Sequence, residues 1–168
     1  MRNPTQRLAH VRILVTAAAF MATALPAWAQ ANSYRLLCTS HGTNWNEPLG
    51  DREGHNLQVA DATCGVQGGL MDGAVVTQQV LWEWDKGAAT LVSSQSIYRK
   101  PGATLVGVGR NGKLNLQTTD GRVTGWTGGG VLTFGLATGS AAALEKKNAT
   151  WTGRPTGNRT YVLEFVVE

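Results

Sequence analysis

The sequence predicts an all-β protein, either a single antiparallel β-barrel of about eight strands or a β-sandwich. Helical periodicity is almost absent beyond residue 30, and runs rich in Val, Thr, Leu and Trp dominate instead. Glycine, at 21 of 168 residues, separates these runs as short turns would. A series of strands joined by short turns buries its apolar faces by closing into a barrel or by packing as two sheets.

In the first half of the expected domain, alternation is clearest just before the turn Asp85-Lys86-Gly87. Val80, Trp82 and Trp84 share one face of a strand there, and Glu83 lies on the other face. The dipeptides Gly68-Gly69 and Asp72-Gly73 predict a loop over residues 65–73. The strands expected in this half are Tyr34–Thr39, Asn56–Cys64, Ala74–Trp84 and Thr90–Tyr98.

In the second half, two dipeptides predict tight hairpin turns. Asn111-Gly112 and Asp120-Gly121 are residue pairs that tolerate the positive φ angles of such turns. Three consecutive glycines at 128–130 predict a further break. Only Ser140–Lys147 has a helical composition, which predicts one short helix near residues 140–147. The strands expected here are Leu105–Arg110, Lys113–Thr119, Arg122–Thr127, Val131–Ala137, Ala149–Gly153 and Thr160–Val167.

Length and strand count are those of small barrels such as lipocalins, avidins and allene oxide cyclases. The similarity concerns architecture only. The lipocalin signature near the first strand is a glycine, one residue and a tryptophan, whereas two residues separate Gly42 from Trp45 here. Family membership is therefore not inferred.

Residues 1–29 are expected to be a cleavable secretory signal. A basic start with three arginines and no acidic residue precedes an apolar run that ends at Leu25, and Ala27-Trp28-Ala29 supplies an A-x-A cleavage site. The run is shorter than the roughly 20 apolar residues that span a bilayer, so no stable membrane anchor is expected. The sequence thus predicts a secreted or periplasmic protein, cleaved near Ala29, with residues 30–168 as a single barrel domain.

The positive charge of the chain belongs mostly to this signal. The whole chain has 15 basic and 11 acidic residues, and removal of three arginines with the signal leaves the two kinds nearly balanced. The remaining Lys and Arg residues are scattered, so a nucleic-acid partner is not expected. No cofactor is expected either, because the glycines at 107, 109 and 112 precede a segment that alternates like a strand and not like a helix.

Cys38 and Cys64 are expected to form a disulfide, because an isolated pair in an exported small domain usually does so. A zinc-thiolate site would need further ligands at short spacing. The segment between the two cysteines carries His41 and His55, the histidines of the mature chain.

The histidine-bearing segment has two interpretations. It is either a solvated polar loop or a site in which His55 acts as an acid or base with Glu53 or Asp51. A metal site is not expected, because His41 and His55 do not have a compact ligand spacing. These residues are weak catalytic candidates.

The tryptophans give the stronger hypothesis. Trp82 and Trp84 on one strand face, with Trp126 on a neighbouring strand, form either the core of a filled barrel or the wall of a ligand cavity. The function favoured is binding of a small apolar or aromatic ligand, or of a partner protein, without catalysis, with polar contacts from His41 and His55. A barrel isomerase or hydrolase and a structural envelope protein are the alternatives.

Overall fold

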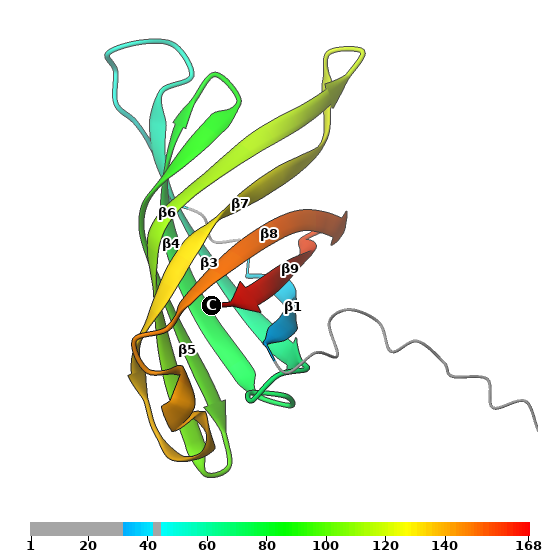
Figure 1. Cartoon of the computed structure of the whole chain (residues 1–168). Helices are drawn as coiled ribbons and strands as arrows, with labels where there is room; N and C mark the ends of the chain where they lie inside the picture. Colours follow the sequence, from blue (N-terminus) through cyan, green and yellow to red (C-terminus); the bar gives the residue numbers. More distant parts are fainter. Residues whose placement is uncertain (1–31, 42–44) are drawn as a thin grey trace, which may run out of the picture.

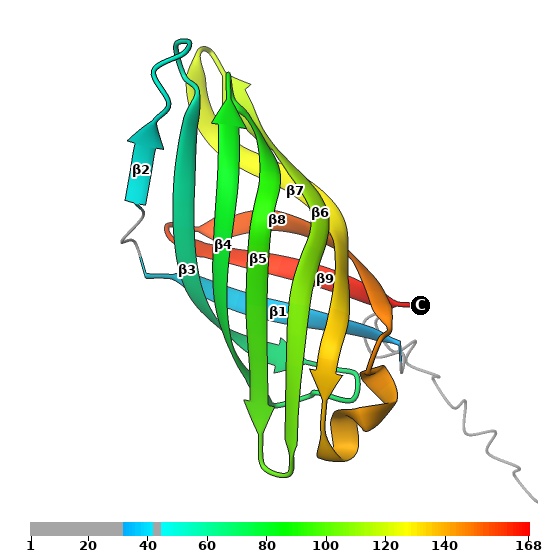
Figure 2. The same cartoon turned by 90° about the vertical axis from the view of Figure 1, so that its left-hand side faces the viewer.

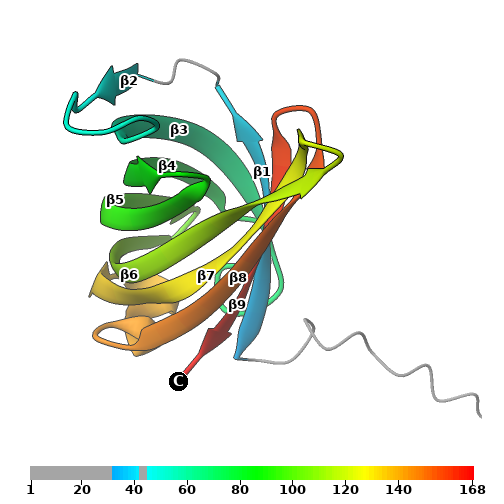
Figure 3. The same ribbon diagram turned by 90° about the horizontal axis from the view of Figure 1, so that it is seen from above.

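Eight antiparallel strands form one closed barrel in the structure, a computed structural model that describes residues 32–41 and 45–168. The strands follow one another around the barrel in chain order, and pairing of β1 with β3 closes it (Figures 1 and 3). The predicted barrel is confirmed, and the expected signal segment 1–29 lies outside the described residues. The closed barrel consists of β1 (Ser33–Ser40), β3 (Asn56–Gln67), β4 (Val75–Asp85), β5 (Ala88–Lys100), β6 (Ala103–Thr119), β7 (Arg122–Ala137), β8 (Asn148–Gly157) and β9 (Thr160–Val167).

The seam that closes the barrel lies between β1 and β3. Cys38 and Cys64 are direct cross-strand partners in this seam, with Cα atoms 4.0 Å apart, and they form the predicted disulfide. Both cysteines are buried inside the barrel. β1 pairs with the second half of β3 only, and the short strand β2 (Trp45–Pro48) pairs with its first half. The disulfide therefore joins two strands of the wall as well as the ends of a loop.

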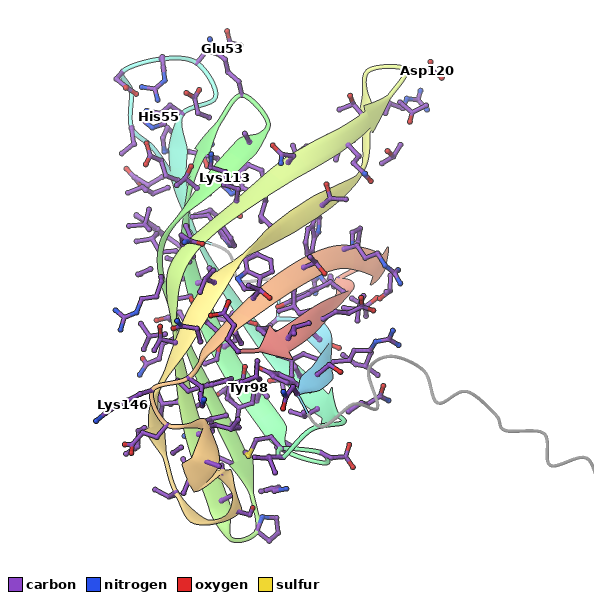
Figure 4. All side chains as sticks on the ribbon, viewed as in Figure 1. Glu53, His55, Tyr98, Lys113, Asp120 and Lys146 are labelled. Carbon is purple, nitrogen blue, oxygen red and sulfur yellow. A yellow bond between two sulfur atoms is a disulfide. The ribbon has the colours of Figure 1, made fainter. Side chains whose placement is uncertain are left out.

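The lower end of the barrel, as oriented in Figure 1, is filled by aromatic side chains. Tyr34 stacks on Phe165 with ring centroids 4.7 Å apart, and Tyr98 and Phe134 form a T-shaped pair with centroids 6.1 Å apart. Figure 4 shows Tyr98 low in the barrel. A 3₁₀ helix, η2 (Gly139–Leu144), packs beneath this cluster and buries Ala141. No helix in the described part of the chain is long and apolar enough to cross a membrane.

Two expected strand breaks do not occur. β6 runs without interruption through Asn111 and Gly112, and β7 runs through the three glycines 128–130. The chain bulges at residue 110 instead of turning, and the side-chain oxygen of Asn111 accepts a hydrogen bond from the Val131 amide at 3.0 Å. The other expected turn is present at Asp120-Gly121, where φ is 51° and 74°. The expected helix is only η2, and β2 is an exposed strand that the sequence pattern did not predict.

The barrel wall is uneven in height. The strands from β3 to β7 have 11 to 17 residues, whereas β1 and β9 have 8 and β8 has 10. Figures 1 and 2 show the β4–β5 and β6–β7 hairpins rising at the upper end, well above β8 and β9. The interior face of the tall strands therefore continues above the rim of the short ones.

Candidate functional site

The upper half of the barrel interior is hollow. A cavity of about 330 Å³ lies above the aromatic cluster and reaches the exposed residues of the β8–β9 turn, so it is open to solvent. Along β4 the lining begins at Gln78 and continues through every second residue to Trp84. The largest side chains that line the cavity are Trp82, Trp84, Leu91, Leu114, Leu116, Trp126, Leu132, Trp151, Tyr161, Leu163 and Phe165.

The strand with the clearest sequence alternation supplies one wall. Because side chains alternate between faces, Trp82 and Trp84 both point inward, as the sequence predicted. Trp82 is buried and pairs across β4 and β5 with Leu91. Trp84 lies higher, and its indole nitrogen donates a hydrogen bond of 2.9 Å to the side-chain oxygen of Gln58 on β3. The wall thus combines apolar rings with one fixed polar contact.

The opposite wall consists of two indoles placed against glycines. The ring of Trp126 lies over Gly153, where an added Cβ would come within 3.1 Å of the ring atom Cζ3. Trp151 lies over Gly112, where the corresponding distance to Cζ2 is 3.0 Å. Gly112 therefore makes room for an indole and does not form a turn. The sequence placed Trp126 in the cavity wall but on a strand next to that of Trp82 and Trp84, which was wrong, because β5 and β6 lie between β4 and β7. It missed Trp151, for which the neighbouring glycine-rich strands were the available signal.

Three polar side chains of the cavity lining form a cluster, the polar floor, which is named after the low positions of Gln78 and Ser96. Gln78 and Ser96 are the lowest lining residues of β4 and β5, and they are cross-strand partners. Tyr161 on β9 faces them, with its hydroxyl oxygen 3.5 Å from the side-chain oxygen of Gln78. Burial raises the pKa of Tyr161 to about 12, so the hydroxyl is neutral at physiological pH. The sequence pattern did not single out this group.

His55 lies outside the cavity, in the turn between β2 and β3 at the upper end of the barrel (Figure 4). One ring nitrogen, Nδ1, is 2.5 Å from a carboxylate oxygen of Asp51, and the other, Nε2, is 2.8 Å from Glu83 on β4. Arg52 adds hydrogen bonds to Asp51 and to Asp85 at the end of β4. These residues form a clamp, the His55 clamp, which holds the turn against the β4–β5 hairpin.

Two carboxylates favour the protonated ring of His55. The hydrogen bond to Asp51 is the largest cause of a raised pKa of His55, and the bond to Glu83 is the next. The same bond lowers the pKa of Asp51. When both ring nitrogens donate to carboxylates, neither has a lone pair free to accept a proton from a substrate. This geometry suits a structural contact better than a general base.

The other histidine lies elsewhere. His41 is exposed at the end of β1, and its Nε2 is 2.7 Å from the hydroxyl oxygen of Thr63. Its backbone amide donates a hydrogen bond to the backbone oxygen of Asp61 on β3. Asp61 is six residues from His55 along the chain, and six residues of extended strand span about 20 Å. Neither histidine lines the cavity, so the two do not converge on the tryptophans.

The third sequence candidate, Glu53, is exposed at the tip of the turn that carries His55 (Figure 4). Asp51 contacts His55 directly, as one of the two sequence alternatives expected. Within residues 32–41 and 45–168, no three His, Cys, Asp or Glu side chains are arranged to hold a metal ion.

The fold and the site together define a class: a closed, eight-stranded up-and-down β-barrel with a disulfide at its seam and an open, tryptophan-lined cavity. Comparison with protein-family models, with curated protein sequences and with solved structures finds no match to this chain.

Proposed function

We propose that this protein binds a small apolar or aromatic molecule inside the barrel, without catalysis. The observation that carries the proposal is the cavity of about 330 Å³ with four indoles in its lining. Protein interiors are close-packed and contain few voids larger than one water molecule. A water occupies about 30 Å³ in the liquid, so this space corresponds to roughly eleven. The lower half of the same barrel is filled with side chains, so the open upper half supports the binding of a ligand there.

The shape and chemistry of the lining indicate the kind of ligand. Indole rings on opposite walls, Trp82 and Trp84 on β4 against Trp126 and Trp151, favour a flat molecule that can lie against their faces or edges. If each non-hydrogen atom of a ligand takes up roughly the volume of one water molecule, the cavity fits a ligand of roughly 10 to 15 such atoms. A fused two-ring aromatic has this size and shape.

Export of the protein is part of the proposal. The disulfide between Cys38 and Cys64 is compatible with an oxidising compartment, where such bonds persist. The expected signal at residues 1–29 would place the barrel there. A secreted or periplasmic protein with this cavity is suited to holding a sparingly soluble molecule away from water.

The enzyme hypothesis receives less support. His55, its weak catalytic candidate, donates from both ring nitrogens and lies outside the cavity lining. An acid–base residue must reach the reacting atoms of a bound substrate. The arrangement therefore favours binding over turnover. A purely structural role is also less well supported, because a structural protein does not need a cavity and a filled barrel would be sufficient.

Naphthalene is a suitable first probe, since it has the expected size and no polar group. We expect it to shift the indole N–H resonances of Trp82, Trp84, Trp126 and Trp151 in ¹⁵N-correlated spectra. Trp45 is the internal control, because it lies on β2 outside the cavity and is 51% exposed. Replacing Trp126 with leucine should weaken binding, and replacing Trp45 should not. Unchanged cavity indoles at saturating naphthalene would contradict the proposal.

A further inference from the structure

Several polar residues line the cavity, and two of them, Gln58 and Ser94, already bond to the Trp84 indole and the Gly109 amide. Gln78, Ser96 and Tyr161, the polar floor, lie close together in the same lining as the indoles and leucines. A uniformly apolar ligand would leave these groups facing hydrocarbon. Burying polar groups without hydrogen bonds costs free energy, so the floor favours a ligand that supplies a partner.

The hydrogen bonds at the floor are incomplete. The Tyr161 hydroxyl and the Gln78 oxygen are 3.5 Å apart, longer than the roughly 2.7 Å of a well-formed O–H···O bond. In the described part of the chain, the Gln78 side-chain nitrogen and the Ser96 hydroxyl have no hydrogen-bond partner. An atom placed among the three groups could therefore accept from one and donate to another.

The ring that carries the Tyr161 hydroxyl is held in place before a ligand arrives. The ring of Tyr161 packs edge-on against Trp126, with centroids 5.8 Å apart and planes at 63°. Ser96 is 5% exposed, and its Cβ lies about 5 Å from that of its cross-strand partner Gln78. Because its ring is packed in this way, Tyr161 loses little conformational entropy when its hydroxyl binds a ligand. The floor thus resembles a prepared subsite.

None of the three groups is hydrogen-bonded to an ionised side chain in the part of the chain that the structure describes. Two charged residues line the cavity, Asp61 and Arg159, and they lie beside the end of β1, where the Ser40 amide bonds to the Arg159 carbonyl. The backbone oxygen of Asp61 accepts a hydrogen bond there from the backbone amide of His41. A charged ligand group at the floor would lose its hydration without gaining a counter-ion.

We propose that the natural ligand is a flat, uncharged molecule with one hydroxyl, carbonyl or amide group, which lies at the floor between Gln78 and Tyr161 while the rings contact the indoles. This inference rests on the proposed ligand-binding function and specifies the chemistry of the ligand. One net hydrogen bond contributes about 1 kcal/mol, so the polar group should improve affinity by about tenfold if it gains one or two such bonds.

Three probes of similar size test this inference by isothermal titration calorimetry at pH 7: naphthalene, 2-naphthol and 2-naphthoate. We expect 2-naphthol to bind about tenfold more tightly than naphthalene and the anionic 2-naphthoate to bind most weakly. Tyr161→Phe and Gln78→Leu should each reduce the preference for 2-naphthol over naphthalene. The matched control is Gln79→Leu, since Gln79 is the next residue of β4 and faces outward.

The outcomes separate this inference from the proposed function. Equal affinity for naphthalene and 2-naphthol, or a preference that survives both Tyr161→Phe and Gln78→Leu, would overturn the polar subsite while ligand binding stands. Tightest binding of 2-naphthoate would also overturn it and would direct attention to Arg159 in the cavity lining. Absence of binding by all three probes would instead count against the proposed function. Ser96→Ala, which removes one oxygen, provides the same comparison if a larger substitution prevents folding.

Discussion

Removal of the disulfide at the barrel seam should destabilise the protein strongly. Cys38 and Cys64 are separated by 26 residues, and the chain-entropy relation for a loop of this size gives about 3.5 kcal/mol at 25 °C. This is a large part of the 5–15 kcal/mol that typically separates the folded and unfolded states of a domain. The seam is the place where the first and third strands must meet, so the bond acts on barrel closure.

The perturbation is the double variant Cys38→Ala/Cys64→Ala, which leaves no polar thiol in the buried seam. Urea unfolding followed by tryptophan fluorescence gives the free energy of unfolding. With a urea m-value of about 2 kcal/mol/M, the midpoint should fall by nearly 2 M. Addition of a reducing agent should lower the midpoint of the wild-type protein by a similar amount and leave that of the double variant unchanged. A loss below about 1 kcal/mol, with the m-value unchanged, would refute this reasoning.

Three further predictions concern the clamp, the glycines and the cavity. His55 has a raised pKa in the folded protein, so the stability it contributes is fully present below the ordinary pKa of about 6.5 and is lost as pH rises through the folded pKa. The lowered pKa of Asp51 adds stability that is lost only as pH falls through its own folded pKa. Urea midpoints measured against pH should show the alkaline loss, and His55→Gln should abolish it; an identical profile in that variant would refute the clamp. Gly153→Ala places a methyl 2.6 Å from the Leu163 side chain and should cost about 1–3 kcal/mol in thermal unfolding, whereas Gly135→Ala, with nothing within 4 Å, should change stability by less than about 0.5 kcal/mol. Equal effects of the two substitutions would contradict the close packing of Leu163 and Trp126 against Gly153. Ala60→Phe should fill part of the cavity and weaken naphthalene binding at least tenfold in calorimetry, with an undiminished urea midpoint, and unaltered affinity would mean that the probe binds elsewhere.

The fold could be predicted from the sequence because strand alternation and turn residues are local signals. Trp82 and Trp84 reveal the inward face of β4 by spacing alone, and Asp120-Gly121 forms the turn that its residue types predict. The same local rules failed at Asn111-Gly112. There the glycine accommodates the ring of Trp151, a residue of another strand, and a rule about turn residues does not contain that tertiary contact.

The candidate site could be predicted only in part for the same reason. Trp82, Trp84 and Trp126 were expected to share a wall; all three line the cavity, but Trp126 lies on the opposite wall. His41 and His55 were expected to add polar contacts to a ligand there. Instead, His41 is hydrogen-bonded to Thr63, and His55 is hydrogen-bonded within the His55 clamp. Tyr161 was missed because its role depends on meeting Gln78 across the barrel, 83 residues away in the chain. Spacing along one strand is visible in a sequence, whereas the opposing wall depends on barrel closure.

The central claim is that the tryptophan-lined space holds a ligand. Intermolecular nuclear Overhauser effects between naphthalene protons and assigned tryptophan side chains test it most directly. We expect contacts from the probe to Trp82 on one wall and to Trp126 and Trp151 on the other, with none to Trp45. Contacts confined to Trp45 and the outer surface, or none at a saturating concentration of naphthalene, would contradict the account.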